Sequence, residues 1–98
     1  MYVLRIEHPV ADFSVWKATF DSDPGGRQRS GVRSYRVMRG TDDANLAMID
    51  LEFDTARQAE AMLGTLRGLW TRVDGSLISD PQARIVQTVE TGDYTPQR

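Results

Sequence analysis

The first twenty-two residues constrain the fold most, because a strand pattern changes there directly into a helix pattern. Apolar side chains alternate along residues 2–8, the period of a strand with two unlike faces, and Pro9 ends it. A helix over about residues 12–22 follows, with Asp12 as a suitable N-cap. Its aromatic side chains recur at helical spacing: Phe13, Trp16 and Phe20. The only histidine, His8, is therefore expected at a strand end beneath a tryptophan-bearing helix.

A breaker-rich loop over residues 23–31 separates this unit from a predicted hairpin of residues 32–40 and 46–53. The turn between the two strands, residues 41–45, is rich in side chains that bond their own backbone. A symmetrical hairpin has chemically sensible cross-strand pairs on both faces. On one face they are Met38 with Met48, Arg36 with Asp50 and Ser34 with Glu52, and on the other Val37 with Ile49, Tyr35 with Leu51 and Arg33 with Phe53.

A second helix follows, capped by Asp54 or Thr55, and a last strand is expected from Ala83 to Glu90. The order strand, helix, strand, strand, helix, strand predicts one α+β domain over residues 1–98. It is a ferredoxin-like sandwich, a four-stranded antiparallel sheet with both helices on one face. The polar segment 91–98 is expected to be a flexible tail. The residues expected under the helices are Leu4, Ile6, Tyr35, Val37, Ile49, Leu51 and Phe53.

Composition excludes several classes of function. The 98 residues contain no cysteine, so disulfides and thiolate chemistry are excluded, and a cytoplasmic location is the default expectation. One histidine without cysteine does not supply a usual zinc or iron site, so no metal is expected. A net charge of −2 gives no broad attraction for nucleic acid or anionic membrane. No segment is apolar for the roughly 20 residues that a membrane-spanning helix needs.

The sheet face turned away from the helices mixes methionine and valine with arginine and carboxylates. Such a surface suits a homodimer in which charges pair across a two-fold axis, and a wetted open sheet is the alternative. Carboxylates on the central strand argue against an RNA-binding sheet. The residues expected on this face are Val3, Arg5, Glu7, Arg36, Met38, Met48, Asp50, Glu52, Arg84 and Val86.

Three segments together resemble the dimeric α/β-barrel superfamily, in its antibiotic biosynthesis monooxygenase-like and cyclase-like branch. They read His8-Pro9-Val10-x-Asp12-Phe13-x-x-Trp16-Lys17-x-x-Phe20-Asp21, Gly31-Val32-x-x-Tyr35-Arg36-Val37 and Asp50-x-Glu52-Phe53-Asp54. The resemblance implies a barrel of two protomers, each binding a ligand between its own sheet and helices. Members of this superfamily include cofactor-independent oxygenases, haem-degrading enzymes and isomerases.

The sequence departs from two of these branches. The haem-degrading branch holds iron with a histidine of the second helix, and residues 54–73 contain none. The cofactor-independent oxygenases pair a tryptophan with an asparagine and an arginine, but the only asparagine, Asn45, lies in the hairpin turn. Neither haem nor another cofactor is therefore expected.

Three residues are the candidates for catalysis. In the ferredoxin-like order, the first and third strands are expected to run parallel, with the second strand antiparallel to them. His8, Arg33 and Phe53 then meet at one end of the sheet with the N-termini of both helices, a setting that favours an anionic group. His8 is a candidate general base, and Arg33 and Tyr35 could stabilise an oxyanion. The alternatives are a structural histidine bonded at the strand end and a tyrosine that belongs to the core.

Further side chains are candidates for binding a planar ligand. The aromatic ones are Trp16, Phe20, Phe53 and Trp70. At helical spacing such residues are commonly plain core packing. Arg29, with Arg27 beside it in the glycine-containing loop, could close over an anionic substrate, and a solvated loop is the alternative.

These observations lead to one hypothesis and one alternative. The hypothesis is a small homodimer that binds an aromatic or carbonyl-bearing metabolite and acts on it as a cofactor-independent oxygenase, cyclase or isomerase. The alternative is a non-catalytic ligand-sensing or interaction module. An open cavity at His8 would favour the first.

Overall fold

The structure, a computed structural model, describes residues 1–96 and has the predicted order of elements. The strands and helices are β1 (Tyr2–Pro9), α1 (Phe13–Asp21), β2 (Ser34–Arg39), β3 (Leu46–Phe53), α2 (Ala56–Val73) and β4 (Gln82–Gln87). The predicted last strand is too long at its C-terminal end, since regular pairing stops at Gln87. Residues 97–98 of the predicted tail lie outside the described residues.

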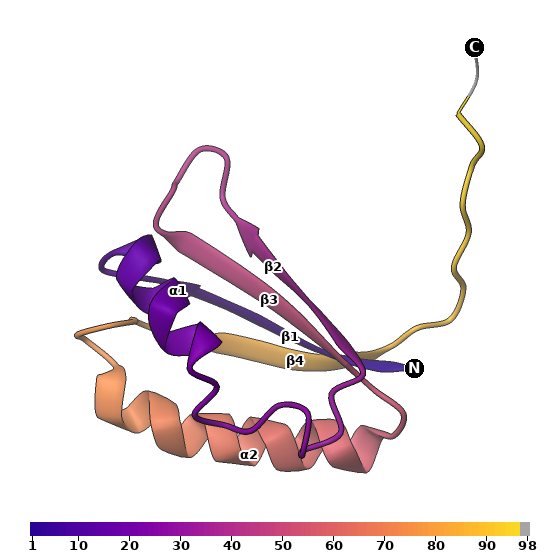
Figure 1. Ribbon diagram of the computed structural model, residues 1–98, viewed down its shortest axis with the longest axis horizontal. Helices are drawn as coiled ribbons and strands as arrows, with labels where there is room; N and C mark the ends of the chain where they lie inside the picture. The colour runs from indigo at the N-terminus through magenta and orange to yellow at the C-terminus, as the bar shows by residue number, and fades with distance from the viewer. Residues whose placement is uncertain (97–98) are drawn as a thin grey trace.

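The four strands form one antiparallel sheet in the order β2-β3-β1-β4, as Figure 1 shows. The predicted hairpin register is confirmed: Tyr35 lies opposite Leu51, and Arg36 opposite Asp50. This register keeps apolar side chains on one face of the sheet, because neighbouring residues of a strand point to opposite faces. The ferredoxin-like fold is therefore confirmed.

Both helices begin with side-chain caps that the sequence supplies. The carboxylate of Asp12 accepts a hydrogen bond from the Val15 amide at 3.2 Å. At α2, the Thr55 hydroxyl accepts from the Gln58 amide at 3.1 Å, and the Gln58 side chain accepts from the Thr55 amide at 3.3 Å. This reciprocal capping box satisfies amides that the first turn leaves unpaired.

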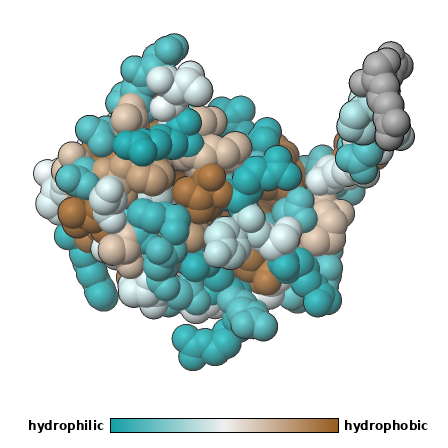
Figure 2. Space-filling model, turned by 45° about the horizontal axis from the view of Figure 1, so that its top comes forward, coloured by the Kyte–Doolittle hydropathy of each residue, from teal (hydrophilic) through white to brown (hydrophobic). Residues whose placement is uncertain are grey.

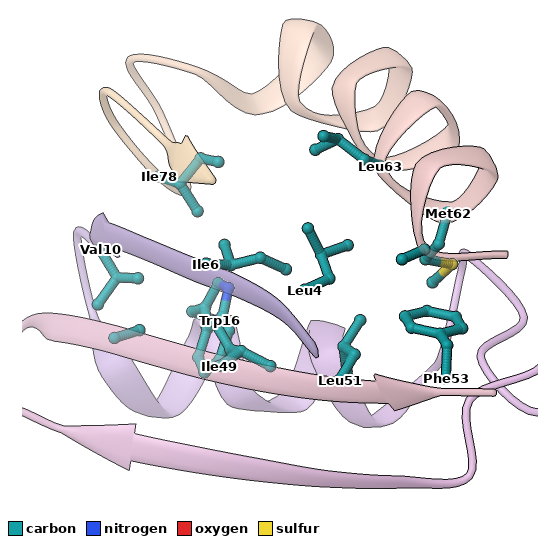
Figure 3. Close-up of a cluster of buried hydrophobic side chains, with 12 residues drawn as sticks. Leu4, Ile6, Val10, Trp16, Ile49, Leu51, Phe53, Met62, Leu63 and Ile78 are labelled. Carbon is teal, nitrogen blue, oxygen red and sulfur yellow. The ribbon is translucent and has the colours of Figure 1, made fainter. Parts of the chain in front are cut away.

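The core lies between the sheet and the two helices. Figure 3 shows Phe53 beside Met62 at one end and Trp16 near Ile6 and Ile49 toward the other. Fully buried side chains come from the two central strands and α2: Leu4, Leu51, Phe53 and Met62. α1 contributes Trp16 as its one buried residue, so α2, with Ala59, Met62 and Leu63 buried, supplies more of the core from the helical layer.

Two expectations about the sheet are wrong. β1 and β3 run antiparallel, with Tyr2 opposite Phe53 and His8 opposite Ala47. A crossover makes β1 and β2 parallel and the hairpin then reverses β3, so His8 and Phe53 lie at opposite ends, and so do the two helix N-termini. Tyr35 is 55% exposed rather than core, because β2 is the edge strand beyond the reach of α2.

The other sheet face carries the mixed surface that the sequence predicts. Arg5 and Asp50 form a two-point ion pair, with Nε–Oδ1 and Nη2–Oδ2 distances of 3.1 Å. On the face drawn in Figure 2, hydrophobic side chains lie in patches separated by hydrophilic ones, and the C-terminal segment stands away from the body. Within residues 1–96, no helix has the length and apolar character to cross a membrane.

Candidate functional site

A cavity of about 250 Å³ lies between the helix-covered face of the sheet, the two helices and the segment after α1. Its sheet wall is formed by Ile6, His8, Ile49 and Leu51. Its helix walls are formed by Trp16, Thr19 and Phe20 of α1 and by Met62, Leu66, Leu69, Trp70, Arg72 and Val73 of α2. Asp23, Pro24, Gly25, Arg27, Leu77 and Ile78 complete it. The lining is mostly apolar with a few polar groups, the usual character of a small-molecule site.

His8 is the polar group of the sheet wall. It shares its face with Leu4 and Ile6, as predicted, and is only 2% exposed. Its ring lies 5.5 Å from that of Trp16 at an angle of 71°, an edge-to-face contact. Burial lowers the pKa of His8 below its ordinary value, and a hydrogen bond to the Pro9 carbonyl offsets part of that effect.

The hydrogen bond of His8 fixes which ring nitrogen is free. Nδ1 lies 3.3 Å from the Pro9 carbonyl oxygen, which can only accept, so in the neutral ring Nδ1 carries the proton and Nε2 the lone pair. Nε2 forms no hydrogen bond with residues 1–96. In that range, every side-chain nitrogen or oxygen that is completely buried has a hydrogen-bond partner, so Nε2 is not completely buried. Nε2 therefore opens onto the cavity, where water or a ligand can reach it.

Aromatic rings of α1 form one side of the cavity and continue to the edge strand. Trp16 lies 5.4 Å from Phe13 and 5.4 Å from Phe20, measured between ring centroids. Phe20 in turn meets Tyr35 of β2 edge-on at 5.6 Å. Rings at these separations pack favourably, so the row holds α1 against the sheet with Trp16 next to His8.

Arg27 stands at the wall made by the segment after α1. Its Nη1 donates to the Phe20 carbonyl at 2.8 Å and lies 3.4 Å from Oδ1 of Asp23. The guanidinium carbon lies 3.8 Å from the centre of the Phe20 ring and 5.1 Å from that of Tyr35. These contacts fix a cation beside an apolar cavity.

The segment that carries Arg27 needs left-handed backbone at several positions. Asp23, Gly26 and Gly31 have φ values of 57°, 63° and 98°. Gly25 passes close to α2, since a Cβ there would lie 3.1 Å from Cε of Met62. The breaker residues read from the sequence therefore serve to bring this segment against α2 and close one side of the cavity.

The structure brings some of the predicted site residues together and separates the others. Those that line the cavity are His8, Trp16, Phe20 and Trp70. Those that do not are Tyr35, Arg33, Phe53 and Arg29. The grouping of His8 with Arg33 is wrong because it depended on a parallel β1–β3 pair. Arg33 is exposed and pairs with Asp54 at 2.7 Å, and its amide donates to the Glu52 carbonyl at the far end of β3.

The remaining predicted binding residues have other surroundings. Phe53 is fully buried within the core, and Tyr35 lies outside the cavity against Phe20 and Arg27. Arg29 lies over Gly26, where its Nη2 would be 2.7 Å from an added Cβ. Of the two loop arginines expected near an anionic ligand, Arg27 lines the cavity and Arg29 does not.

Comparisons with known proteins agree on the fold. No family model matches the sequence, and no curated protein matches it significantly. Among solved structures, the chain is similar to a candidate antibiotic biosynthesis monooxygenase from Deinococcus radiodurans. The identity is 12%, the TM-score is 0.73, and the match covers 98% of this chain and 100% of that one.

Two further structures show how varied the proteins of this fold are. SnoaB, a cofactor-independent oxygenase from Streptomyces nogalater, matches at 14% identity and a TM-score of 0.72, over 92% of this chain and 94% of its own. A variant of MhuD with two manganese protoporphyrin IX molecules per active site matches at 9% identity and 0.72, over 96% and 100%. At such identities the likeness establishes the antibiotic biosynthesis monooxygenase-like fold and no particular activity.

The residues present do not fit a haem site of the kind that the fold family implies. No residue of α2 is a histidine, so the iron ligand that the resemblance places on the second helix is missing. The cavity of about 250 Å³ is below the roughly 300 Å³ at which sites for drug-sized ligands begin. Within residues 1–96 no three metal-binding side chains come together.

Proposed function

We propose that the protein binds a small aromatic or carbonyl-bearing metabolite in the cavity between its sheet and helices, and acts on it without a cofactor. The observation that carries this proposal is the unpartnered Nε2 of a buried, neutral histidine in an apolar cavity. A desolvated site of this kind is where a general base is effective.

In the proposed reaction, Nε2 of His8 takes a proton from an acidic carbon or hydroxyl group of the substrate. The Pro9 carbonyl accepts a hydrogen bond from Nδ1–H, so it keeps the ring in the required tautomer and stabilises the imidazolium that forms. The product of this step is an enolate or a phenolate. Isomerisation, cyclisation or reaction with oxygen can follow from such an anion.

The walls support a flat substrate. Trp16 and Trp70 line the cavity from the two helices, and Leu66 and Ile49 line it from α2 and the sheet. Aromatic and aliphatic side chains contribute binding energy through the area they bury and do not compete for the polar group of the substrate. The apolar and aromatic lining therefore favours a compact ring system.

Proton abstraction can be tested without knowing the substrate. We expect the protein to accelerate hydrogen–deuterium exchange at the acidic carbon of 2-indanone in D₂O, followed by NMR. General base catalysis contributes about 10²–10⁴-fold, so His8→Gln should lose most of the acceleration while it still folds and binds. Arg57→Gln, a change on the exposed side of α2, is the matched control. Equal exchange with wild type and His8→Gln would refute the role of His8.

A second candidate function is a non-catalytic ligand-binding module. The observation that favours it is the separation of Tyr35 and Arg33 from the cavity, which leaves His8 without the two oxyanion partners expected from the sequence. Saturable binding of 2-indanone without exchange would support this module.

We also propose that two copies associate through the open sheet face and that the protein acts in the cytoplasm. The Arg5–Asp50 ion pair beside the Met38–Met48 pair is a surface able to complement a second copy of itself. Analytical ultracentrifugation should show a dimer for wild type and a monomer for Met48→Glu. A wild-type protein that stays monomeric at millimolar concentration would refute the proposed dimer.

A further inference from the structure

The guanidinium of Arg27 is largely buried and only partly used. Its side chain is 15% exposed and lines the cavity. Both of its polar contacts, to the Phe20 carbonyl and the Asp23 carboxylate, are made by Nη1. Within residues 1–96, Nε and Nη2 have no hydrogen-bond acceptor. Since a guanidinium carries five N–H groups in a fixed fork, three remain to be satisfied by water or a ligand.

The aromatic contacts of Arg27 orient this fork without using it. The guanidinium carbon lies 3.8 Å from the Phe20 ring centre, and Phe20 is itself a cavity residue. A cation on a ring face is held by the charge distribution of the ring, which takes up no N–H group. The open donors of Arg27 are thus held beside the aromatic wall.

The charges around the cavity favour an anion. The charged residues that line it are Asp23, Arg27 and Arg72, two cations and one carboxylate, while His8 is neutral. The carboxylate of Asp23 is already engaged: its two oxygens accept the backbone amide of Arg27 at 3.0 and 3.1 Å. Asp23 therefore ties down the segment, and a cationic excess remains for a ligand.

We propose that Arg27 determines the charge of the ligand, and that the cavity takes a small planar aromatic anion whose carboxylate or phenolate oxygen binds Nε and Nη2 of Arg27. This inference rests on the proposed function, because it assigns a ligand class to the same cavity. The ring of the ligand lies against Trp16 and Phe20. The fork geometry favours a two-oxygen carboxylate over a single oxygen.

The test compares ligands that differ in charge but little in shape: 2-naphthoate and 2-naphthamide, with 2-indanone as a second neutral probe. Binding is measured by isothermal titration calorimetry with the full chain. We expect 2-naphthoate to bind about tenfold or more tightly than 2-naphthamide, the gain typical of hydrogen bonds to a charged group. Arg27→Gln should remove this preference, Arg27→Lys should keep part of it, and Arg57→Gln should not change it.

The outcomes separate this inference from the proposed function. If both naphthalene probes bind equally to wild type, or if Arg27→Gln keeps the preference, the role of Arg27 is refuted while the cavity remains a binding site. If none of the three probes binds saturably at millimolar concentration, both proposals are refuted. Should Arg27→Gln fail to fold, as judged by circular dichroism, Arg27→Lys becomes the deciding variant. It should show a smaller preference for 2-naphthoate than wild type, and an unchanged preference would refute the role of Arg27.

Discussion

The imidazole of His8 and the indole of Trp16 meet edge to face, with ring centres 5.5 Å apart. This contact joins the end of β1 to the middle of α1 and shields one side of the imidazole from water. Because a charged ring would be poorly solvated there, the contact is one reason why burial lowers the pKa of His8.

An NMR titration of His8 should therefore have a midpoint below 6.5, the ordinary value for histidine. The chain has a single histidine, so its ring signals need no assignment by mutation. In Trp16→Ala the midpoint should rise toward the ordinary value, because water then reaches the ring. A wild-type midpoint at or above 6.5 would contradict this account of burial.

The same shift predicts how stability depends on pH. The folded-state pKa is the lower one, so between it and 6.5 the unfolded chain binds a proton that the folded chain does not. The free energy of unfolding should fall as the pH drops from about 7 through this window, and the contribution of His8 should be constant above it. Urea unfolding of wild type and His8→Gln at several pH values measures the difference. A constant difference between the two proteins from pH 7 to 5 would contradict the prediction.

The capping box of α2 should contribute measurably to stability. Thr55→Ala removes the hydroxyl that accepts the Gln58 amide, at an expected cost of about 0.5–2 kcal/mol in urea unfolding. Thr65→Ala is the matched control, because Thr65 is an exposed mid-helix residue whose hydroxyl bonds only its own helix, to the Ala61 carbonyl. The control should be neutral or slightly stabilising, since alanine is the better helix former. Equal losses for both variants would argue against the cap.

Phe53 should behave as a core residue. It is fully buried, so Phe53→Ala should lower the free energy of unfolding by about 3–5 kcal/mol. Val15→Ala removes apolar atoms from an exposed position of α1 and should change stability by less than about 0.5 kcal/mol. A loss at Phe53 below about 1 kcal/mol would contradict the packing described for this end of the core.

Filling the cavity should abolish binding without unfolding the protein. Leu66 lines the cavity from α2 and is partly exposed, so the larger side chain in Leu66→Trp can occupy the space that the ligand needs. We expect no measurable binding of 2-naphthoate or 2-indanone by calorimetry and an unchanged circular dichroism spectrum. Undiminished binding in a folded Leu66→Trp protein would place the ligand elsewhere.

Local features of the fold could be predicted from the sequence. The helix caps at Asp12 and Thr55 depend on hydrogen bonds within one turn, and the hairpin register depends on pairs such as Arg36 and Asp50 across one turn. The buried face of β1 could also be predicted, because a period of two leaves only one apolar side. His8 was placed beneath Trp16 on these grounds, and the structure confirms it.

Which residues line the cavity depended on how elements far apart in the sequence are arranged in space. Arg33 was expected near His8, but the crossover and hairpin together set β3 antiparallel to β1 and put these residues at opposite ends of the sheet. Arg27 lies beside the cavity because the segment after α1 folds back along α2, where Gly25 approaches Met62.

The sequence by itself determined the order of elements, their caps, the register of the hairpin and the face on which His8 lies. These features are fixed by the backbone geometry and hydrogen bonding of neighbouring residues. Only the tertiary structure decided that a cavity remains between the helices and that Arg27 lines it together with Trp70. The volume left between packed elements depends on how closely they approach, and no local pattern specifies that distance.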